Sequence, residues 1–217
     1  MNDFIDAYCE RMGAGFWAEP VNALTNAAFL IAAYLLFRQL RDTGDRAALA
    51  LTGLIAIIGV GSFLFHTFAT RWAAIADVLP ITVFMLAAVA IGLQRRFGLS
   101  GQVGALGAIV FFLSGVMIGF SPLVTVVPGG SAGYLPALVT LGLFALFLAR
   151  RGDAFARFFL LATPVFALSL TLRTLDTPLC EAVPLGTHFT WHVLNAVTLY
   201  LITRGLISAG TIGARAE

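Results

Sequence analysis

Three histidines stand out among the few polar side chains of this sequence. His188 and His192 are four residues apart, so both imidazoles project from one face of a helix. A third imidazole, from His66, would complete a three-histidine zinc site that leaves one position for water, as catalytic zinc sites do. The alternative is that each histidine forms a hydrogen bond to a neighbouring helix. All three fall at one depth of the expected membrane helices, which favours metal binding.

A serine and an aspartate accompany the histidines along the chain. Ser62 precedes His66 by four residues and shares its helix face, and Asp77 follows eleven residues after His66. A carboxylate there can take and return a proton, and a hydroxyl can donate to an oxyanion, which suits hydrolysis of an amide. The alternatives are that Asp77 is a first-turn acid favoured by the helix dipole and that Ser62 is a small residue at a helix interface.

The composition indicates what kind of element carries these residues. Of the 217 residues 59% are hydrophobic and 11% are charged, and the mean hydropathy is +0.94. A soluble domain carries about 25% charged residues, so the composition excludes an ordinary soluble domain, a disordered chain and a nucleic-acid-binding protein. All 13 basic residues are arginine, which excludes a retinal-type Schiff base on lysine. The apolar runs are continuous rather than alternating, so we predict an all-α, polytopic membrane protein and not a barrel.

Seven transmembrane helices are expected from the uncharged runs. They cover residues 20–37, 47–70, 72–94, the run 97–149 divided at 121–133, then 154–172 and 186–202. This gives an outer acidic segment at 1–19, a seven-helix membrane hydrolase domain at 20–206 and a cytoplasmic tail at 207–217. Acidic residues in the first segment argue against a cleavable signal peptide. Arginines concentrate in alternate loops, which predicts an N-terminus outside and a cytoplasmic C-terminus.

Five strings resemble the alkaline ceramidase family, and in particular its bacterial-type branch. They are YCER at 8–11, AEPVNALTN at 18–26, GSFLFH at 61–66, ADVLP at 76–80 and HFTWH at 188–192. The family belongs to a group of seven-helix membrane hydrolases that includes adiponectin-receptor-like proteins. The resemblance implies that the three histidines bind Zn²⁺, that Asp77 acts on the attacking water and that Ser62 assists at the oxyanion. ADVLP departs from the usual LDELP-like string, which leaves the identity of the substrate open.

Oxygen ligands gather in the outer N-terminal segment. Asp6, Glu10 and Glu19 precede the first helix, and Asn22 follows within its first turn. Such a set suits Ca²⁺, which takes 6–8 oxygen ligands. The resemblance implies a calcium site here, with Glu10 and Glu19 at matching positions and Ala7 where the family has its first aspartate. The alternative is a solvated acidic segment.

Both cysteines of the chain, Cys9 and Cys180, are expected on the outer side. Two cysteines on one side of an exported surface allow one disulfide. The resemblance implies a bridge between these two regions, and two free buried thiols are the alternative.

The sequence therefore favours a zinc-dependent intramembrane hydrolase that cleaves a ceramide-like lipid amide to a fatty acid and an amine lipid. A seven-helix metal-containing receptor or lipid-binding protein is the alternative, and a transporter is a third. Ser62 and Asp77 beside three histidines favour the enzyme, whereas a transporter should have broken helices or further buried charges. The expected partner is a membrane lipid, without nucleic acid, and the sequence identifies no protein partner. We expect an integral, multi-pass membrane protein, in the cytoplasmic membrane if the chain is bacterial.

Overall fold

A computed structural model of the chain describes residues 1–127 and 129–208. The described part is helical, and its β-type pairing is limited to one isolated bridge, between Phe4 and Thr70. The elements are α1 (Pro20–Thr25), α2 (Ala27–Leu40), α3 (Arg46–Phe68), α4 (Arg71–Phe97), α5 (Gly101–Gly119), α6 (Leu123–Val126), η1 (Ser131–Tyr134), α7 (Leu135–Arg150), α8 (Ala156–Leu175), η2 (Thr177–Leu179) and α9 (His188–Leu206). The prediction of an all-helical protein is confirmed.

Six segments of the described chain are long and apolar enough to cross a membrane. They are Pro20–Leu40, Arg46–Phe68, Arg71–Phe97, Gly101–Gly119, Ser131–Arg150 and Ala156–Leu175. α9 is not among them, although its 19 residues equal α5 in length. The reason is its polar content, because α9 carries both histidines of the HxxxH pair together with Asn195 and Arg204. The division of the long uncharged run falls where expected, since α6 and η1 separate α5 from α7.

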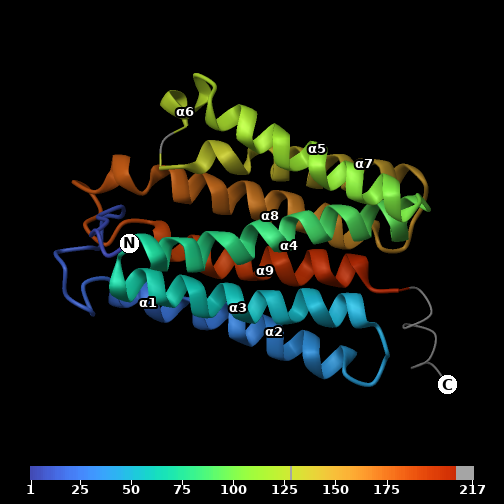
Figure 1. The fold of residues 1–217 in the computed structure, drawn as a ribbon, viewed down its shortest axis with the longest axis horizontal. Coiled ribbons are helices and arrows are strands. Elements are labelled where there is room, and N and C mark those ends of the chain that lie inside the picture. Colours follow the sequence, from blue (N-terminus) through green and yellow to red (C-terminus); the bar gives the residue numbers. More distant parts are fainter. Residues whose placement is uncertain (128, 209–217) are drawn as a thin grey trace.

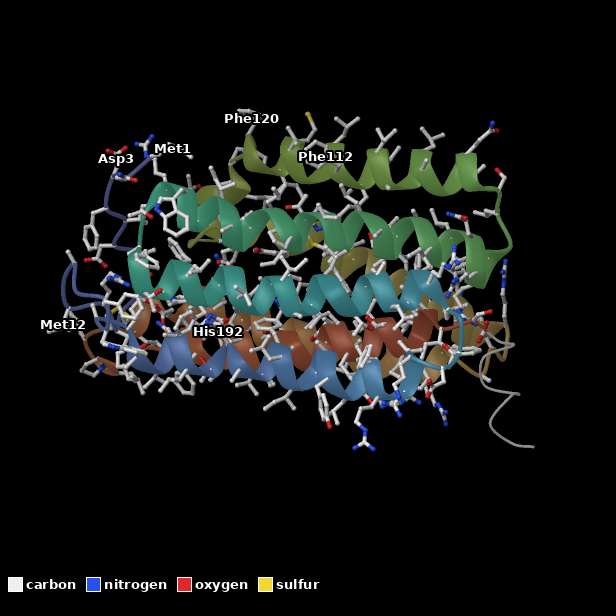
Figure 2. The ribbon with its side chains drawn as sticks, turned by 60° about the horizontal axis from the view of Figure 1, so that its bottom comes forward. Met1, Asp3, Met12, Phe112, Phe120 and His192 are labelled. Carbon is white, nitrogen blue, oxygen red and sulfur yellow. A yellow bond between two sulfur atoms is a disulfide. The ribbon has the colours of Figure 1, made fainter. Side chains whose placement is uncertain are left out.

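α9 lies in the middle of the bundle. The long helices run side by side along the longest axis of the molecule (Figure 1). α9 packs against α8, α2 and α4, and it also contacts α1 and α3. α5 lies at one side, where Gly104 is its one buried residue, and Phe112 and Phe120 point outward (Figure 2). Apolar side chains on the outside and polar ones on the central helix are typical of a membrane protein with an internal site.

An ion pair joins three helix ends at the far end of the bundle from the N-terminus. Asp45 caps α3 by accepting from the backbone N–H of Ala48 at 3.0 Å. The same carboxylate accepts from both terminal nitrogens of Arg95 at 2.9 Å and from the N–H of Ser208 at 2.9 Å. Burial raises the pKa of Asp45, but these hydrogen bonds outweigh burial and hold the pKa below its usual value. Of the expected tail, only residues 207 and 208 belong to the described part.

The N-terminal segment covers the other end of the bundle. Phe4 pairs with Thr70, and the N–H of Ile5 donates to the carbonyl of Ala69 at 2.8 Å. Ala69 itself ends α3 in the left-handed region, at φ 46°. The segment thereby lies against the turn between α3 and α4, close to the end of α3 that carries His66.

Candidate metal and catalytic site

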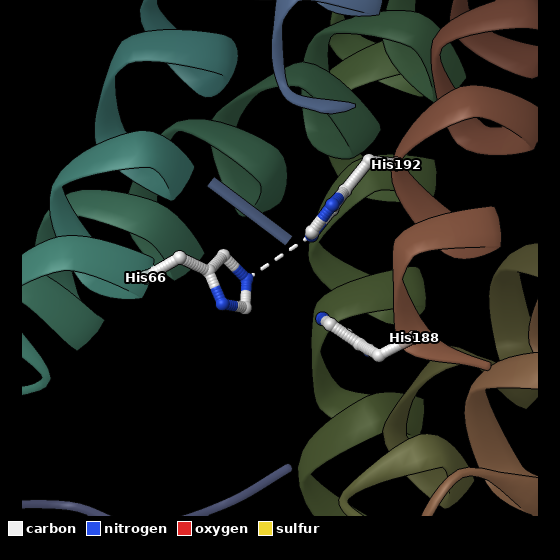
Figure 3. Close-up of side chains that lie close together, drawn as sticks. All are labelled: His66, His188 and His192. Carbon is white, nitrogen blue, oxygen red and sulfur yellow. Dashed lines mark hydrogen bonds between the residues drawn. The ribbon is translucent and has the colours of Figure 1, made fainter. Parts of the chain in front are cut away.

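Three histidine side chains from two helices converge inside the bundle. His66 lies in the last turn of α3, and His188 and His192 lie in the first two turns of α9. The three imidazoles point toward one another (Figure 3) and are at most 2% exposed. One nitrogen of each lies within 4.8 Å of the others, and the Nε2 atoms of His66 and His192 are 3.1 Å apart. This is the spacing of ligands around one ion, so the group is suited to hold a metal.

The outer nitrogens of two histidines have partners that fix the tautomer. Nδ1 of His66 lies 2.5 Å from Oε2 of Glu19, and a carboxylate oxygen can only accept. Nδ1 of His192 lies 2.9 Å from Oγ1 of Thr25, whose own hydrogen donates to the carbonyl of Val21 at 2.7 Å. In the neutral form of each ring, Nδ1 therefore carries the proton and Nε2 presents its lone pair to the cluster. Two Nε2 atoms at this distance can share a proton or ligate one metal ion.

His188 is held differently. Its ring stacks on Tyr8, with centroids 3.5 Å apart and an interplanar angle of 15°. Within the described chain its Nδ1 has no hydrogen-bond partner. Burial raises the pKa of Tyr8 to about 12, which keeps the phenol neutral beside the histidines. The N-terminal segment thus forms one wall of the histidine cluster.

Asp77 and Ser62 lie beside the cluster where α3 and α4 cross. Ser62 is buried, and the carboxyl group of Asp77 has His66, Ser62 and Arg173 as its polar neighbours. In the described part of the chain, Oδ1 of Asp77 is buried without a hydrogen-bond partner. Gly61 permits this crossing, because a Cβ there would lie 2.7 Å from the carbonyl carbon of Ala76. An unpaired carboxylate oxygen next to converging imidazoles is free to act on a bound water or substrate.

The acidic residues of the N-terminal segment do not form a comparable cluster. Glu10 accepts from the backbone N–H groups of Val21 and Asn22, each at 2.7 Å, and so caps α1. Glu19 is engaged by His66 and by an ion pair with Arg11, and Asp6 is exposed. Among the described residues, the three histidines form the one group of three or more metal-ligating side chains brought within ligand distance.

Glu19 is ionised where it lies. Burial raises its pKa, but hydrogen bonds from His66 and Arg11 outweigh burial and hold the pKa below its usual value. A permanent carboxylate behind His66 increases the basicity of that imidazole as a ligand.

A disulfide and one aspartate hold the N-terminal segment against α9. Cys9 and Cys180 form a disulfide in the structure. Asp176 accepts from the N–H of Cys9 at 3.1 Å and, at the start of α9, from the N–H groups of Thr187 and His188 at 2.7 and 2.8 Å. These bonds satisfy orphan donors at the start of α9 and fix the register of His188.

Arg173 does not pair with the nearby Asp176. The two are three residues apart, but the ion pairs of the described residues do not include this one. Arg173 instead donates to the carbonyl of Gly129 and to Oγ of Ser131 at 2.8 Å. The backbone N–H groups satisfy Asp176, which leaves Arg173 to hold the segment between α5 and α7.

An apolar cavity of about 70 Å³ lies along α9, between the turn after His192 and the other end of the helix. Asn195, one turn after His192, and Tyr134 line the end nearer the histidines, and Phe144, Phe159 and Ile202 line the other end. Its walls come from α4, α5, η1, α7, α8 and α9. A cavity with almost purely apolar walls is suited to a hydrocarbon chain.

The fold and the site together define an all-helical protein with six candidate membrane spans, a buried three-histidine centre and an apolar cavity further along α9. The family model for ceramidase matches residues 7–212, nearly the whole chain. The protein therefore belongs to the ceramidase family, as its motifs predicted, and this membership supports a hydrolase that acts on the amide bonds of lipids. The comparison with curated proteins finds no match.

Proposed function

We propose that this protein is a zinc-dependent hydrolase that cleaves the amide bond of a ceramide-like lipid inside the membrane. The observation that carries the proposal is the convergence of one ring nitrogen from each of His66, His188 and His192, with the unpartnered oxygen of Asp77 beside them. Three neutral imidazoles are the donor set of catalytic zinc, which keeps a fourth position open. Zinc bound there would supply Lewis acidity and would lower the pKa of water toward 7.

The side chains of the chain would perform the remaining steps. Asp77 accepts a proton from the attacking water and returns it to the leaving amine. Ser62 donates a hydrogen bond to the carbonyl oxygen of the substrate as negative charge develops on it. The buried imidazoles and the surrounding helices exclude bulk water, which strengthens both interactions.

The substrate would occupy the apolar cavity with its hydrocarbon chain. Asn195, which lines the cavity, lies one turn of α9 after His192, so an acyl chain that runs from the histidines along α9 would reach the cavity. The amide cleaved is that of a lipid with a long acyl chain, and the products are a fatty acid and an amine lipid. Family membership supports this substrate class.

The proposed depth of the site in the membrane depends on whether α9, which carries two of the histidines, also spans it. We propose that α9 is the seventh span, since it lies parallel to the other long helices and is packed among them. Arginines cluster at the end that holds Asp45 and Arg95, which favours the cytoplasm for that end and the outside for the N-terminal segment. On this arrangement residues 1–19 are external, 20–206 form the hydrolase domain, and the histidines lie in the outer half of the membrane.

Zinc analysis and a lipid assay on purified protein test the proposal. The wild type should contain one zinc per chain, and His192→Ala should lose most of it. Asp77→Asn should keep its zinc, since three histidines remain, but should hydrolyse a ceramide about 10²–10⁴-fold more slowly.

Three outcomes would contradict this assignment. Full zinc content in His192→Ala would exclude the three-histidine site. A folded, zinc-loaded Asp77→Asn protein with wild-type turnover would exclude Asp77 as the base. A zinc-containing wild type that cleaves none of a panel of lipid amides would favour a receptor or lipid-binding protein.

A further inference from the structure

The guanidinium of Arg11 lies inside the acidic segment where calcium was expected. Its Nε donates to Oε1 of Glu19, one terminal nitrogen donates to the carbonyl of Gly13 at 3.0 Å, and the other donates to the backbone carbonyl of His66 at 2.8 Å. The side chains of Arg11 and Glu19 are 0% and 3% exposed. A buried positive charge therefore already occupies the centre of this segment.

The carboxylate oxygens of Glu10 and Glu19 are already used by protein donors, and Asp6 is exposed. Of the expected calcium ligands, only Asn22 has a buried oxygen, Oδ1, without a partner among the described residues, and one oxygen falls short of a calcium shell. Oε1 of Glu19 accepts from Arg11, and Oε2 accepts from His66 and from the amide of Asn22 at 3.0 Å. Both oxygens of Glu10 accept from backbone N–H groups at the start of α1. Calcium needs 6–8 oxygens turned toward one point, and a guanidinium beside that point would repel it. The residues present do not fit a calcium ion.

We propose that Arg11 is a resident cation that takes the place of calcium and positions the metal ligand His66. Arg11 acts on His66 in two ways: it binds the carboxylate that holds Nδ1, and it binds the backbone carbonyl directly. The first contact fixes the rotation of the imidazole, and the second fixes the end of α3 that carries it. Arg11 is a positioning residue, because it contacts the backbone of His66 and the carboxylate behind it rather than the ligating imidazole.

This inference rests on one part of the proposed function, the binding of zinc by His66. Partners in the layer around metal ligands change metal affinity by about 10- to 100-fold when they are removed. Arg11→Gln should therefore bind zinc about 10- to 100-fold more weakly than the wild type. Arg11→Lys keeps the charge but not the planar guanidinium. Its zinc affinity should lie between that of the wild type and that of Arg11→Gln.

The chain offers a matched control in Arg71. This arginine also forms an ion pair at the outer end of the bundle, with Asp3 at 3.1 Å, but both side chains are 66% exposed. Arg71→Gln removes the same charge without touching the histidines and should leave zinc affinity unchanged. Affinity is measured by competition with a chromophoric chelator in detergent, so that no substrate is needed.

Calcium is tested on the wild type itself. Protein purified without calcium is unfolded thermally in the presence of millimolar Ca²⁺ and, as the control, the same concentration of Mg²⁺. A specific ligand at 100 times its Kd would raise Tm by several degrees. We expect equal Tm values in the two salts, because Arg11 already pairs with Glu19 and both oxygens of Glu10 are bound by backbone N–H groups.

Either of two results would overturn the inference. One is a saturable rise of Tm with Ca²⁺ that Glu19→Gln abolishes, which would mean that Arg11 gives way to the ion. The other is unchanged zinc affinity in Arg11→Gln. The calcium measurement uses the wild type, so it tests whether Arg11 takes the place of calcium even if Arg11→Gln does not fold. A wild type that binds zinc but cleaves no lipid amide would contradict the proposed hydrolase activity. It would not contradict the positioning of His66 by Arg11.

Discussion

A single methyl group added at Gly61 should separate the two halves of the catalytic machinery. Gly61 faces α4 one residue before Ser62, and a Cβ there would lie 2.7 Å from the carbonyl carbon of Ala76 and 3.2 Å from the nitrogen of Asp77. Carbon atoms pack at about 3.5–4.0 Å, so α4 would have to move by about 1 Å at this crossing. The histidines lie on α3 and α9, so this movement would carry Asp77 away from them.

The size of the effect follows from this displacement. A misplacement of about 1 Å in a catalytic group lowers the rate about 10²-fold. Overpacking costs about 1–3 kcal/mol of stability, partly offset by about 1 kcal/mol because alanine favours a helix more than glycine does. Gly61→Ala should therefore lose about 10²-fold in turnover, keep its zinc and unfold at a slightly lower temperature.

Gly53 provides the control on the same helix. A Cβ at Gly53 would meet no atom within 4 Å, so Gly53→Ala should keep the turnover and the Tm of the wild type or gain slightly in stability. Turnover of a ceramide, zinc content and thermal unfolding are measured for both variants in one detergent. Wild-type turnover in folded Gly61→Ala would refute the requirement for close contact between α3 and α4.

Other variants test the remaining parts of the structure. Ser62→Ala should lower kcat by about 10²-fold with unchanged zinc content, through the lost donor to the oxyanion. Phe144→Leu should lengthen the cavity and shift relative kcat/KM toward longer acyl chains, measured on a series of ceramides. Peptide mapping without reductant should recover Cys9 and Cys180 as one cross-linked pair, and Cys9→Ser should lose about 2–4 kcal/mol of stability. Because the pKa of Asp45 is lowered, its stabilisation is present above about pH 4 and lost as the pH falls through the lowered value. Asp45→Asn should therefore unfold at a lower temperature at pH 7 and should lose less stability than the wild type between pH 5 and 3.

The helices were predictable because charge and hydropathy change sharply at their ends. Arginines and turn residues marked the boundaries to within a few residues, as at α3, expected at 47–70 and found at Arg46–Phe68. The convergence of the histidines was also accessible, because the four-residue spacing of His188 and His192 fixes a shared face and the alternation of helices sets a common depth. These features depend on local sequence alone.

The contacts around the histidines could not be derived in this way. Glu19 and Arg11 have the charges of a solvated or calcium-binding segment, and only the fold shows that they neutralise each other behind His66. Thr25 gave no signal, because a hydroxyl in a membrane helix usually bonds to its own backbone, as Thr25 also does. Tyr8 stacks on His188 across 180 residues of sequence. Such pairs depend on where the N-terminal segment folds back, which no local pattern encodes.

The order of synthesis gives the histidine cluster a further consequence. His66 and His192 are 126 residues apart, and the disulfide joins residues 171 apart. The ribosome releases α3 long before α9, so an unfinished chain lacks two of the three imidazoles throughout most of its insertion. Cys9 likewise has no disulfide partner until the segment before α9 arrives. Closure of the disulfide and completion of the histidine group therefore both await delivery of the last helix.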